Sequence, residues 1–420
     1  MNDKKPVIWI FSYFAGGPSY CPRVPDYSLG EYLQRNGYDV KIFAGSSLHN
    51  TDKNFITDKT RSKEDLVDGV PFVFLKTRSY KSKKGGTLSF ADYYFNLLKE
   101  YKKYGKPDLI ISAMPQPLAC LAGIKIAKKF NIPCVTYVVD LWPPSIVEYA
   151  DFSDKNPIIQ AMYMFEKWVY KKSSQLVFTW EGAYDYIIDK KWDDVIPKNK
   201  FHYINIGVDL KTFEHNLSDF RISDEDLDRN IFTVMYCGSV RQANDIGTVV
   251  ECAKKLCSEG YADKIRFIIY GDGPDRQILS DKCAREGISN VVFKGFIDKK
   301  YIPYVLSKSD LNILNLKAAA TQKYGNSSNK LFEYLASGNP VIANIDEGKY
   351  PIITKYKCGK VVKAGSIDEY ADGIKYFYEL SDDQMDKYRE NAKNTVKMFD
   401  TEKLNSEWEE IIKKEIYKVK

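Results

Sequence analysis

A glycine- and serine-rich segment followed by a lysine and a glutamate carries the clearest chemistry in this sequence. Gly325 opens the segment, Ser327, Ser328 and Lys330 follow it, and Glu333 lies in the helix-like stretch that begins there. Glycine lets a backbone approach a phosphate closely, and a helix N-terminus presents free N–H groups and the positive end of the helix dipole. The segment therefore suits a diphosphate, although Ser327 or Ser328 would serve equally well as an ordinary N-cap.

Lys330 and Glu333 are three residues apart, so a helix places both side chains on one face. In that arrangement Lys330 reaches phosphate oxygens, while Glu333 accepts hydrogen bonds from sugar hydroxyls. An ordinary surface ion pair is the alternative. The neighbouring Gly325 loop favours the ligand-binding interpretation.

Three further glycine-rich turns follow apolar runs, at the strand ends where open α/β sheets bind ligands. They lie at Gly16 and Gly17, at Gly238 ahead of Arg241, and at Gly271 and Gly273. The last of these turns lacks the third glycine of the GxGxxG fingerprint, so the sequence gives little support to a dehydrogenase.

Two side chains in the first half of the chain are candidates for chemistry on a hydroxyl group. Asp140 ends an apolar run, where it would bind or deprotonate a hydroxyl, or would form an Asx turn ahead of two prolines. His49 follows the second apolar run, where it would face a ligand cleft or would pack within its own loop.

Apolar runs that alternate with helix-like stretches must position these residues. Strands separated by helices predict parallel sheets that are buried on both faces. Two such series predict an α/β protein with domains at residues 1–210 and 211–400, and the polar stretch at 211–230 is expected to link them. A charged amphipathic helix at residues 401–420 carries Trp408 on an apolar stripe that must pack on another element. The predicted strands lie at residues 7–11, 40–43, 109–112, 134–139, 175–179, 232–237, 265–270, 291–293, 311–314, 341–343 and 359–362.

Composition excludes several classes of protein. Hydrophobic residues make up 44% and charged residues 28% of the 420 residues, and no run approaches the roughly 18 apolar residues that span a bilayer. The run at residues 7–11 is too short for a signal peptide, so a cytoplasmic location is expected. The net charge of +6 is mild and argues against nucleic-acid binding. The eight cysteines show no zinc-ligand spacing.

Taken in order, these motifs resemble the retaining glycosyltransferases of family 4, also called glycosyl transferases group 1, which have the GT-B fold. Within that family the chain resembles the sub-group of O-antigen and capsule synthesis that includes N-acetylfucosamine transferases. The most specific match is the run NKLFEYLASGNPVI, from Asn329 to Ile342. Weaker matches extend along nearly the whole chain, at residues 16–17, 140–143, 205–209, 238–241 and 271–274.

The resemblance implies two Rossmann-like, doubly wound parallel-sheet domains that face each other across a cleft, with the C-terminal helix packed back on the first domain. The donor is then a nucleotide sugar, with a UDP-sugar expected, and the acceptor is a saccharide on a polyprenyl diphosphate carrier. Transfer retains configuration, and the leaving diphosphate helps to take the acceptor's proton. Neither a metal nor another cofactor is required, because cationic side chains and helix dipoles replace it.

By resemblance, Gly16 and Gly17 lie against the donor phosphates, and Arg241 and Lys330 neutralise the diphosphate. Glu333 holds the ribose hydroxyls, while the turn near Gly271 and Phe296 contact the base. The predicted site therefore consists of catalytic residues Asp140, Glu333 and His49, diphosphate-binding residues Gly16, Gly17, Arg241, Ser327, Ser328 and Lys330, and nucleoside-binding residues Gly271, Gly273, Phe296 and Glu333.

Two positions depart from the family pattern. The family has a pair of glutamates that would end at Glu333, and the first of them would fall where this chain has Gly325. That glutamate usually contacts the donor sugar, so the sugar stays unidentified. The lysine that usually follows Arg241 by a few residues is also missing, and the segment Gln242-Ala243-Asn244-Asp245 stands there.

These departures leave two other functions open. A non-hydrolysing UDP-sugar 2-epimerase shares the architecture but usually needs several acidic groups and histidines, and this chain has only three histidines. A non-catalytic partner protein would keep the fold without the chemistry, and Gly325 would suit that function. Release of nucleotide in the presence of an acceptor separates a transferase from both.

A basic stretch between Lys76 and Lys106 suggests contact with a membrane. It holds nine basic residues and two acidic ones, with Phe90, Tyr93 and Phe95 among its aromatic residues. Lysines beside aromatic side chains suit the anionic cytoplasmic leaflet of a membrane. The alternative is an ordinary amphipathic helix with lysines on its wet face. The resemblance to enzymes with lipid-linked acceptors favours a peripheral association.

Overall fold

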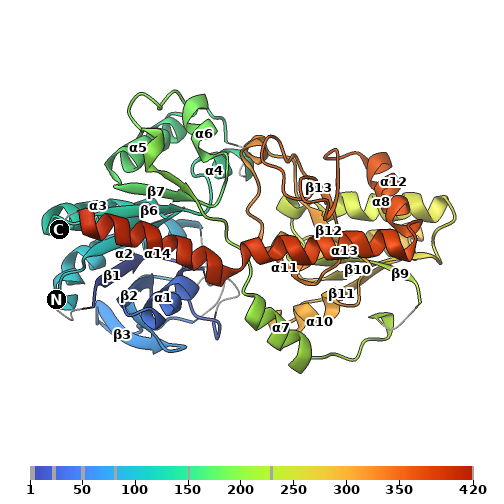
Figure 1. Ribbon diagram of the computed structural model, residues 1–420, viewed down its shortest axis with the longest axis horizontal. Coiled ribbons are helices and arrows are strands. Elements are labelled where there is room, and N and C mark those ends of the chain that lie inside the picture. Colours follow the sequence, from blue (N-terminus) through green and yellow to red (C-terminus); the bar gives the residue numbers. More distant parts are fainter. Residues whose placement is uncertain are drawn as a thin grey trace. The chain divides into compact units, whose positions relative to one another are not determined.

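The computed structural model describes residues 5–20, 25–48, 53–79, 83–149, 152–227 and 230–418. The chain forms two compact units, one made of residues 1–205 together with 402–420, and the other of residues 206–401. Figure 1 shows each unit as a sheet covered by helices. The boundary was expected at residue 210 and lies between Asn205 and Ile206.

The first unit is built on a sheet with the strand order β3-β4-β2-β1-β5-β6-β7-β8. Neighbouring strands are parallel except for β3 and β4, which form an antiparallel hairpin at one edge. No apolar run predicts β3, because half of its residues are charged and most are exposed, as is common for an edge strand. The strands are β1 Val7–Phe11, β2 Asp39–Gly45, β3 Ser62–Val67, β4 Val70–Leu75, β5 Leu109–Met114, β6 Cys134–Val138, β7 Gln175–Phe178 and β8 Phe201–Tyr203.

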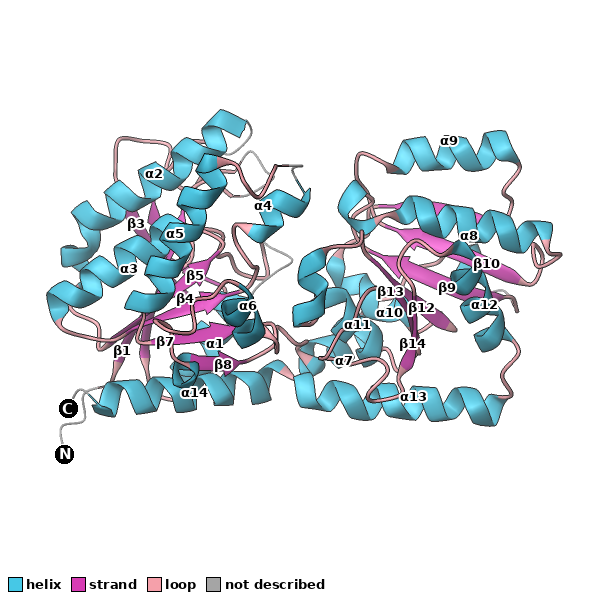
Figure 2. Cartoon of the chain, turned by 90° about the horizontal axis from the view of Figure 1, so that it is seen from above, coloured by secondary structure: helices cyan, strands magenta, loops and turns pink. Residues whose placement is uncertain are grey.

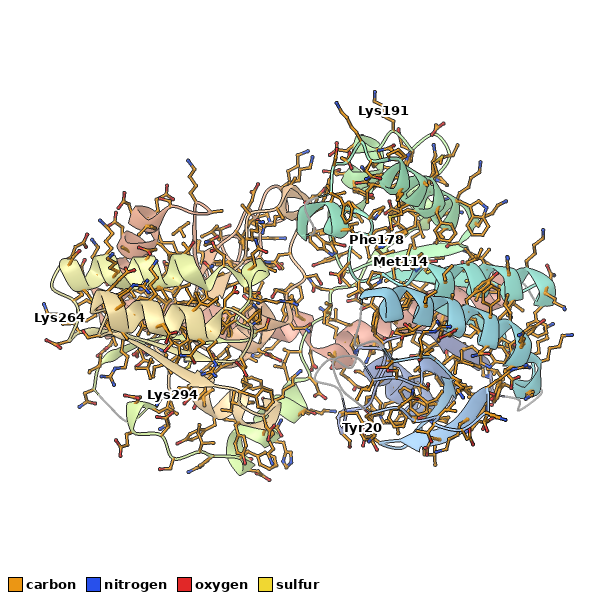
Figure 3. All side chains as sticks on the ribbon, turned by 180° about the vertical axis from the view of Figure 1, so that it is seen from behind. Tyr20, Met114, Phe178, Lys191, Lys264 and Lys294 are labelled. Carbon is orange, nitrogen blue, oxygen red and sulfur yellow. The ribbon has the colours of Figure 1, made fainter. Side chains whose placement is uncertain are left out.

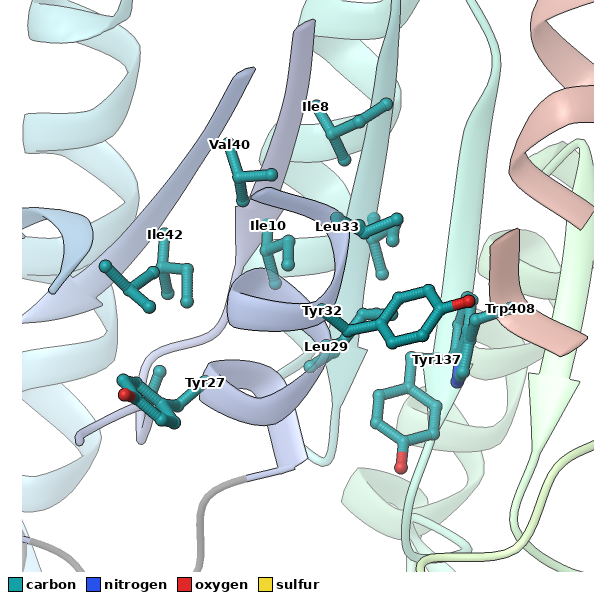
Figure 4. Packing of buried hydrophobic residues seen from close by; sticks show 14 of the residues in the cluster. Ile8, Ile10, Tyr27, Leu29, Tyr32, Leu33, Val40, Ile42, Tyr137 and Trp408 are labelled. Atoms are coloured by element: carbon teal, nitrogen blue, oxygen red, sulfur yellow. The ribbon is translucent and has the colours of Figure 1, made fainter. Parts of the chain in front are cut away.

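Helices cover both faces of this sheet because side chains alternate along each strand. Ile8 and Ile10 of β1 belong to the core beneath α1 and α14, whereas Trp9 and Phe11 face α2 and α3. Figure 4 shows the first of these cores, including Trp408. The helices of the unit are α1 Pro25–Arg35, α2 Lys83–Glu100, α3 Pro117–Phe130, α4 Pro144–Tyr149, α5 Pro157–Lys172, α6 Ala183–Asp189 and α14 Thr401–Lys418.

The C-terminal helix α14, expected to pack on the first domain, is part of the first unit. Trp408 is 3% exposed and meets Tyr137 edge to face, with ring centres 5.1 Å apart. Asn405 Nδ2 donates to Ser28 Oγ at 3.1 Å, and Arg35 pairs with Glu402 at 2.9 Å. The apolar stripe read from the sequence is therefore the face that this helix buries.

The second unit has a wholly parallel sheet with the strand order β11-β10-β9-β12-β13-β14. Figure 2 shows α8 and α13 on opposite sides of it, in agreement with its two apolar cores. The prediction of an α/β chain with two parallel-sheet domains is confirmed. The elements are α7 Leu210–Asp219, β9 Phe232–Cys237, α8 Ile246–Ser258, β10 Ile265–Tyr270, α9 Arg276–Glu286, β11 Val291–Gly295, α10 Ile302–Leu306, β12 Leu311–Asn315, α11 Asn329–Ala336, β13 Val341–Asn344, β14 Gly359–Val362, α12 Ile367–Tyr378 and α13 Asp382–Val396.

The prediction of a linker at residues 211–230 is wrong. Most of the stretch forms α7 and a short 3-10 turn, and it buries Phe213 and Leu227 in a core of the second unit. Its acidic residues dock on the sheet, since Asp224 and Asp226 pair with Lys294 of β11 at 2.6 and 2.7 Å. Figure 3 labels Lys294 on the ribbon of the second unit. The polar residues of this segment form its outer face, and only a few apolar residues anchor it in the core, so its composition alone suggested a linker.

Three global features concern the described part of the chain. No helix there is long and apolar enough to cross a bilayer. The cysteines in it are free thiols. Within the same residues, no group of three or more histidine, cysteine, aspartate or glutamate side chains is placed to hold a metal ion.

Candidate functional site

Two glycine turns pack against each other at the carboxyl edge of the second sheet. Beyond β9 and β10 the backbones stay paired, with Gly238 N donating to Tyr270 O and Val240 N donating to Asp272 O, both at 2.9 Å. A Cβ atom on Gly271 would overlap the carbonyl oxygen of Gly238. Packing between the turns therefore explains why Gly271 is a glycine, and its contact with a nucleoside remains a prediction.

Lys330 lies in the first turn of α11 and reaches the turn after β9. Its Nζ donates to Asn244 Oδ1 at 2.7 Å and to Tyr236 Oη at 3.1 Å. Burial holds the pKa of Tyr236 far above its ordinary value, so the lysine meets a neutral hydroxyl. Arg241, in the same turn as Ser239, is exposed. The structure thus gathers two of the predicted diphosphate-binding cations at one strand end.

The start of α11 fits the sequence interpretation in part. Ser328 occupies the N-cap position with extended backbone, but its side chain makes no capping hydrogen bond. Instead, its backbone N–H donates to Asn326 Oδ1 at 2.9 Å. The hydroxyl of Ser328 is therefore not the ordinary cap that was its alternative role.

Glu333, one turn further along α11, pairs with Lys299 at 3.2 Å. The carboxylate side chain is 19% exposed and the lysine side chain is 51% exposed. Lys299 belongs to the segment that follows Phe296, whose side chain is 75% exposed just beyond β11. An exposed aromatic ring three residues ahead of the ion-pair partner of a mostly buried carboxylate would accept a nucleoside, with the base on the ring and the ribose at the carboxylate.

In the glycine loop of the first unit, the structure shows a side chain of the protein beside Gly17, where a donor phosphate was expected. A Cβ atom on Gly17 would overlap the carboxylate of Asp68, which lies in the turn between β3 and β4. Ser19 N donates to the same carboxylate at 3.0 Å. Close approach of an aspartate therefore explains Gly17. Contact of Gly16 and Gly17 with phosphates remains a prediction, and Asp68 opposes it at Gly17.

The carboxyl edge of the first sheet carries two aspartates. Met114 and Phe178, labelled in Figure 3, end β5 and β7 at this edge. Asp140 follows β6 and is exposed, as its predicted role on a hydroxyl requires. Asp26, at the start of α1, accepts a hydrogen bond from Ser12 Oγ at 2.7 Å, and burial raises its pKa to about 6. His49 lies outside the described residues.

Comparisons with known proteins show that the sequence matches two glycosyltransferase family models. Residues 219–395 match the family model described as Glycosyl transferases group 1, and residues 27–212 match the one described as Glycosyltransferase Family 4. No protein with curated annotation matches the sequence.

Solved structures agree with these models. Sucrose-phosphate synthase from Thermosynechococcus elongatus superposes with a TM-score of 0.73 at 16% identity, over 98% of this chain and 99% of that one. HepE of Anabaena in complex with UDP gives 0.67 at 16% identity, over 97% and 100%. The Escherichia coli trehalose-6-phosphate enzyme bound with UDP-2-fluoro glucose gives 0.72 at 10% identity, over 97% and 99%. The chain is a glycosyltransferase with the GT-B fold.

This glycosyltransferase departs from the family pattern at Gly325 for a structural reason. Gly325 ends a 3-10 turn with a φ of 116°, a backbone conformation that residues with a side chain rarely adopt. A glutamate cannot be accommodated there without strain. A glutamate at this position would require a different backbone conformation of the loop ahead of α11, so Gly325 is not a simple exchange of side chains.

Sequence reasoning missed three residues that shape the site of this glycosyltransferase. Asn244 is a buried side chain that accepts a hydrogen bond from Lys330, and the buried Asn315 bonds to the backbone of Asn244. Lys299 pairs with Glu333, the predicted ribose-binding residue. Asn244 occupies the segment where the family usually has a lysine, which was the only signal in the sequence. Asn315 and Lys299 carry no local motif, since their contacts are made across the fold.

Proposed function

We propose that this glycosyltransferase moves a sugar from a UDP-sugar, such as an N-acetylated hexosamine or deoxyhexosamine donor, to a lipid-diphosphate-linked saccharide in bacterial surface polysaccharide synthesis. The observation that carries the proposal is the fixed ammonium of Lys330 at the start of α11, beside the turn of Arg241. The crystal structures of HepE with UDP and with UDP-glucose support a uridine nucleotide. The sub-group follows from the resemblance of the motifs.

The proposed reaction retains configuration at the anomeric carbon. The bond from this carbon to the diphosphate oxygen breaks, and the bond to the acceptor oxygen forms on the same face of the sugar. The proton of the acceptor hydroxyl passes to the leaving diphosphate. Arg241, Lys330 and the N-terminus of α11 stabilise the negative charge that develops there, in the role that a metal ion plays in other enzymes.

The remaining residues of the proposed site bind the donor or the acceptor and take no part in bond making. Glu333 accepts hydrogen bonds from the ribose hydroxyls, and Phe296 stacks on the base. Glu333 forms an ion pair with Lys299. Ribose must therefore share or displace this ion pair, which its exposed lysine side chain permits. Asp140 orients the acceptor hydroxyl from the edge of the first sheet.

The decisive experiment is a screen of UDP- and GDP-sugars with a polyprenyl-diphosphate-linked saccharide, scored for released nucleotide and for extended glycolipid. We expect both products from one donor, with the same rate in EDTA as in buffer with magnesium. Interconversion of nucleotide sugars without transfer would favour the epimerase. Nucleotide binding without turnover of any donor would favour a non-catalytic partner. Activity lost in EDTA and restored by magnesium or manganese would contradict metal independence.

We also propose a peripheral association with the anionic cytoplasmic face of a membrane, to reach the lipid-linked acceptor. The fold limits which residues of the basic stretch could contact a membrane. Tyr93, Tyr94 and Leu97 are buried in the core of the first unit, so they are not available for insertion. Phe95 and Leu88 on the outer side of α2 are 57% and 48% exposed. The side chains of Lys81, Lys83 and Lys84 lie outside the described residues.

Two exposed lysines, Lys102 and Lys106, lie just beyond α2 and make a sharp test possible. Vesicles with phosphatidylglycerol should sediment the protein, neutral vesicles should not, and high salt should weaken binding. Changing both lysines to glutamate should release the protein. The matched control changes Lys264 and Lys387, exposed lysines of the second unit, and should leave binding intact. Equal sedimentation with neutral and anionic vesicles would refute the association.

A further inference from the structure

A buried asparagine holds the ammonium group of Lys330. Lys330 Nζ donates to Asn244 Oδ1 at 2.7 Å, and it lies 4.9 Å from the centre of the Tyr236 ring. Asn244 is only 5% exposed. Its amide cannot turn over without pointing its N–H groups at the ammonium, because Nδ2 donates to Ser239 O at 2.7 Å and to Ser239 Oγ at 2.8 Å. The acceptor side of Asn244 is therefore fixed toward the lysine.

The loop segment that carries Asn244 is itself held by the central strand β12. Asn315, its last residue, is fully buried, and its Nδ2 donates to Asn244 O at 2.9 Å and to Asp245 O at 2.6 Å. Asp245 adopts a φ of 44°, which is uncommon for a residue with a side chain. A backbone in this conformation persists only where its surroundings fix it, and the two bonds from Asn315 do so.

We propose that Asn244, supported by Asn315, is a positioning residue that fixes Lys330 for the donor diphosphate. The inference rests on the proposed role of Lys330 as a diphosphate ligand. Asn244 lies in the segment where the family usually has a second lysine. This chain has a neutral acceptor there, which orients the existing cation in place of adding another one.

An amide suits that task better than the other polar side chains. Its oxygen accepts a hydrogen bond from the ammonium and adds no negative charge beside the lysine. A carboxylate at the same position would form an ion pair with Lys330 and cancel charge that the diphosphate requires. An alanine would leave the long lysine side chain free to sample other rotamers, whose restriction on binding costs affinity.

The test is a double-mutant cycle on nucleotide affinity, measured by calorimetric titration with UDP and, in parallel, with GDP. We expect Lys330→Ala to weaken binding by about tenfold, because a charged hydrogen bond to phosphate is lost. Asn244→Ala should weaken binding several-fold in the wild-type background. In the Lys330→Ala background the same change should have no effect, since Asn244 then has no lysine to position. Asn244→Asp should weaken binding although its side chain has the same size.

A pair of buried asparagines on one strand provides the matched control. Asn315→Ala should weaken UDP binding, because it releases the turn of Asn244. Asn312 lies on the same strand and bonds instead to Ser309 Oγ at 2.9 Å and to Ser337 Oγ at 3.2 Å. Asn312→Ala should lower thermal stability to a similar degree and leave UDP affinity unchanged.

The outcomes separate this inference from the proposed function. If Asn244→Ala weakens binding equally in both backgrounds, or not at all in the wild type, Asn244 does not act through Lys330 and the inference is overturned. Equal effects of Asn315→Ala and Asn312→Ala would overturn the role of Asn315. Wild-type affinity in Lys330→Ala, or no binding of UDP and GDP by the wild type, would instead refute the proposed diphosphate site itself.

Discussion

A buried glutamate in the first unit should make this glycosyltransferase less stable as the pH rises. Glu166 on α5 is fully buried, and it accepts hydrogen bonds from Tyr170 Oη at 2.8 Å and Tyr186 Oη at 2.7 Å. Burial raises the pKa of Glu166 from 4.5 to about 8. The two tyrosine hydroxyls and the charge of Lys190 lower it only in part.

The sign and the size of the effect follow from these two pKa values. A raised pKa means that the folded protein holds the proton more tightly than the unfolded chain. The stability that the proton provides is fully present below about pH 4.5 and is lost as the pH rises toward about 8. Each unit between the two pKa values corresponds to about 1.4 kcal/mol, so the loss between pH 5 and pH 8 is on the order of 3 kcal/mol.

Glu166→Gln isolates this contribution, because glutamine keeps the shape of the side chain and does not titrate. Urea denaturation at pH 5 and pH 8 gives the free energy of unfolding of both proteins. We expect the variant to gain about 3 kcal/mol relative to the wild type between these pH values. Glu181→Gln, at an exposed glutamate of the same unit, should change nothing. A variant-to-wild-type difference that is the same at both pH values would refute the reasoning.

Three further predictions concern packing, the loop and the nucleoside site. Trp408→Ala should lower the free energy of unfolding by about 3–5 kcal/mol in denaturant titrations, because it empties the core beneath α14, whereas Trp408→Phe should lower it by less. Gly325→Glu, which restores the family's residue, should reduce the melting temperature and the transfer rate, since a φ of 116° strains the new side chain; a more active variant would contradict this. Glu333→Ala should lower kcat/KM for the donor by about tenfold or more, while Lys299→Ala, which removes only its ion-pair partner, should keep most of it.

The sequence predicted most of the strands that are buried on both sides, with β4 at Val70–Leu75 as an exception. The runs at residues 232–237 and 265–270 coincide with β9 and β10, because a strand inside a parallel sheet needs apolar side chains on both faces. It was insufficient where few residues anchor a segment. The exposed strand β3 shows no apolar run, and α7 is held by Phe213 among polar neighbours.

The site was predictable where its chemistry lies within one segment and not where it depends on contacts across the fold. The spacing of Lys330 and Glu333 on one helix could be read directly from the sequence. The buried bonds of Asn315 to the turn of Asn244 join the end of β12 to the loop after β9. An asparagine at the end of a strand has many possible partners, and only the topology of the sheet selects this one.

The glycine turns show how far a residue type alone can carry a functional argument. Glycine in a turn indicates either a positive φ or a group that approaches the backbone closely, and it does not indicate which group. At Gly271 the group is the backbone of the neighbouring turn, and at Gly17 it is the carboxylate of Asp68. A phosphate beside Gly17 would meet that negative charge at short range, where repulsion between like charges is strong. The cations proposed to bind the diphosphate, Arg241 and Lys330, lie in the second unit, and contact of the Gly17 loop with the donor phosphates stays a prediction that the charge of Asp68 opposes.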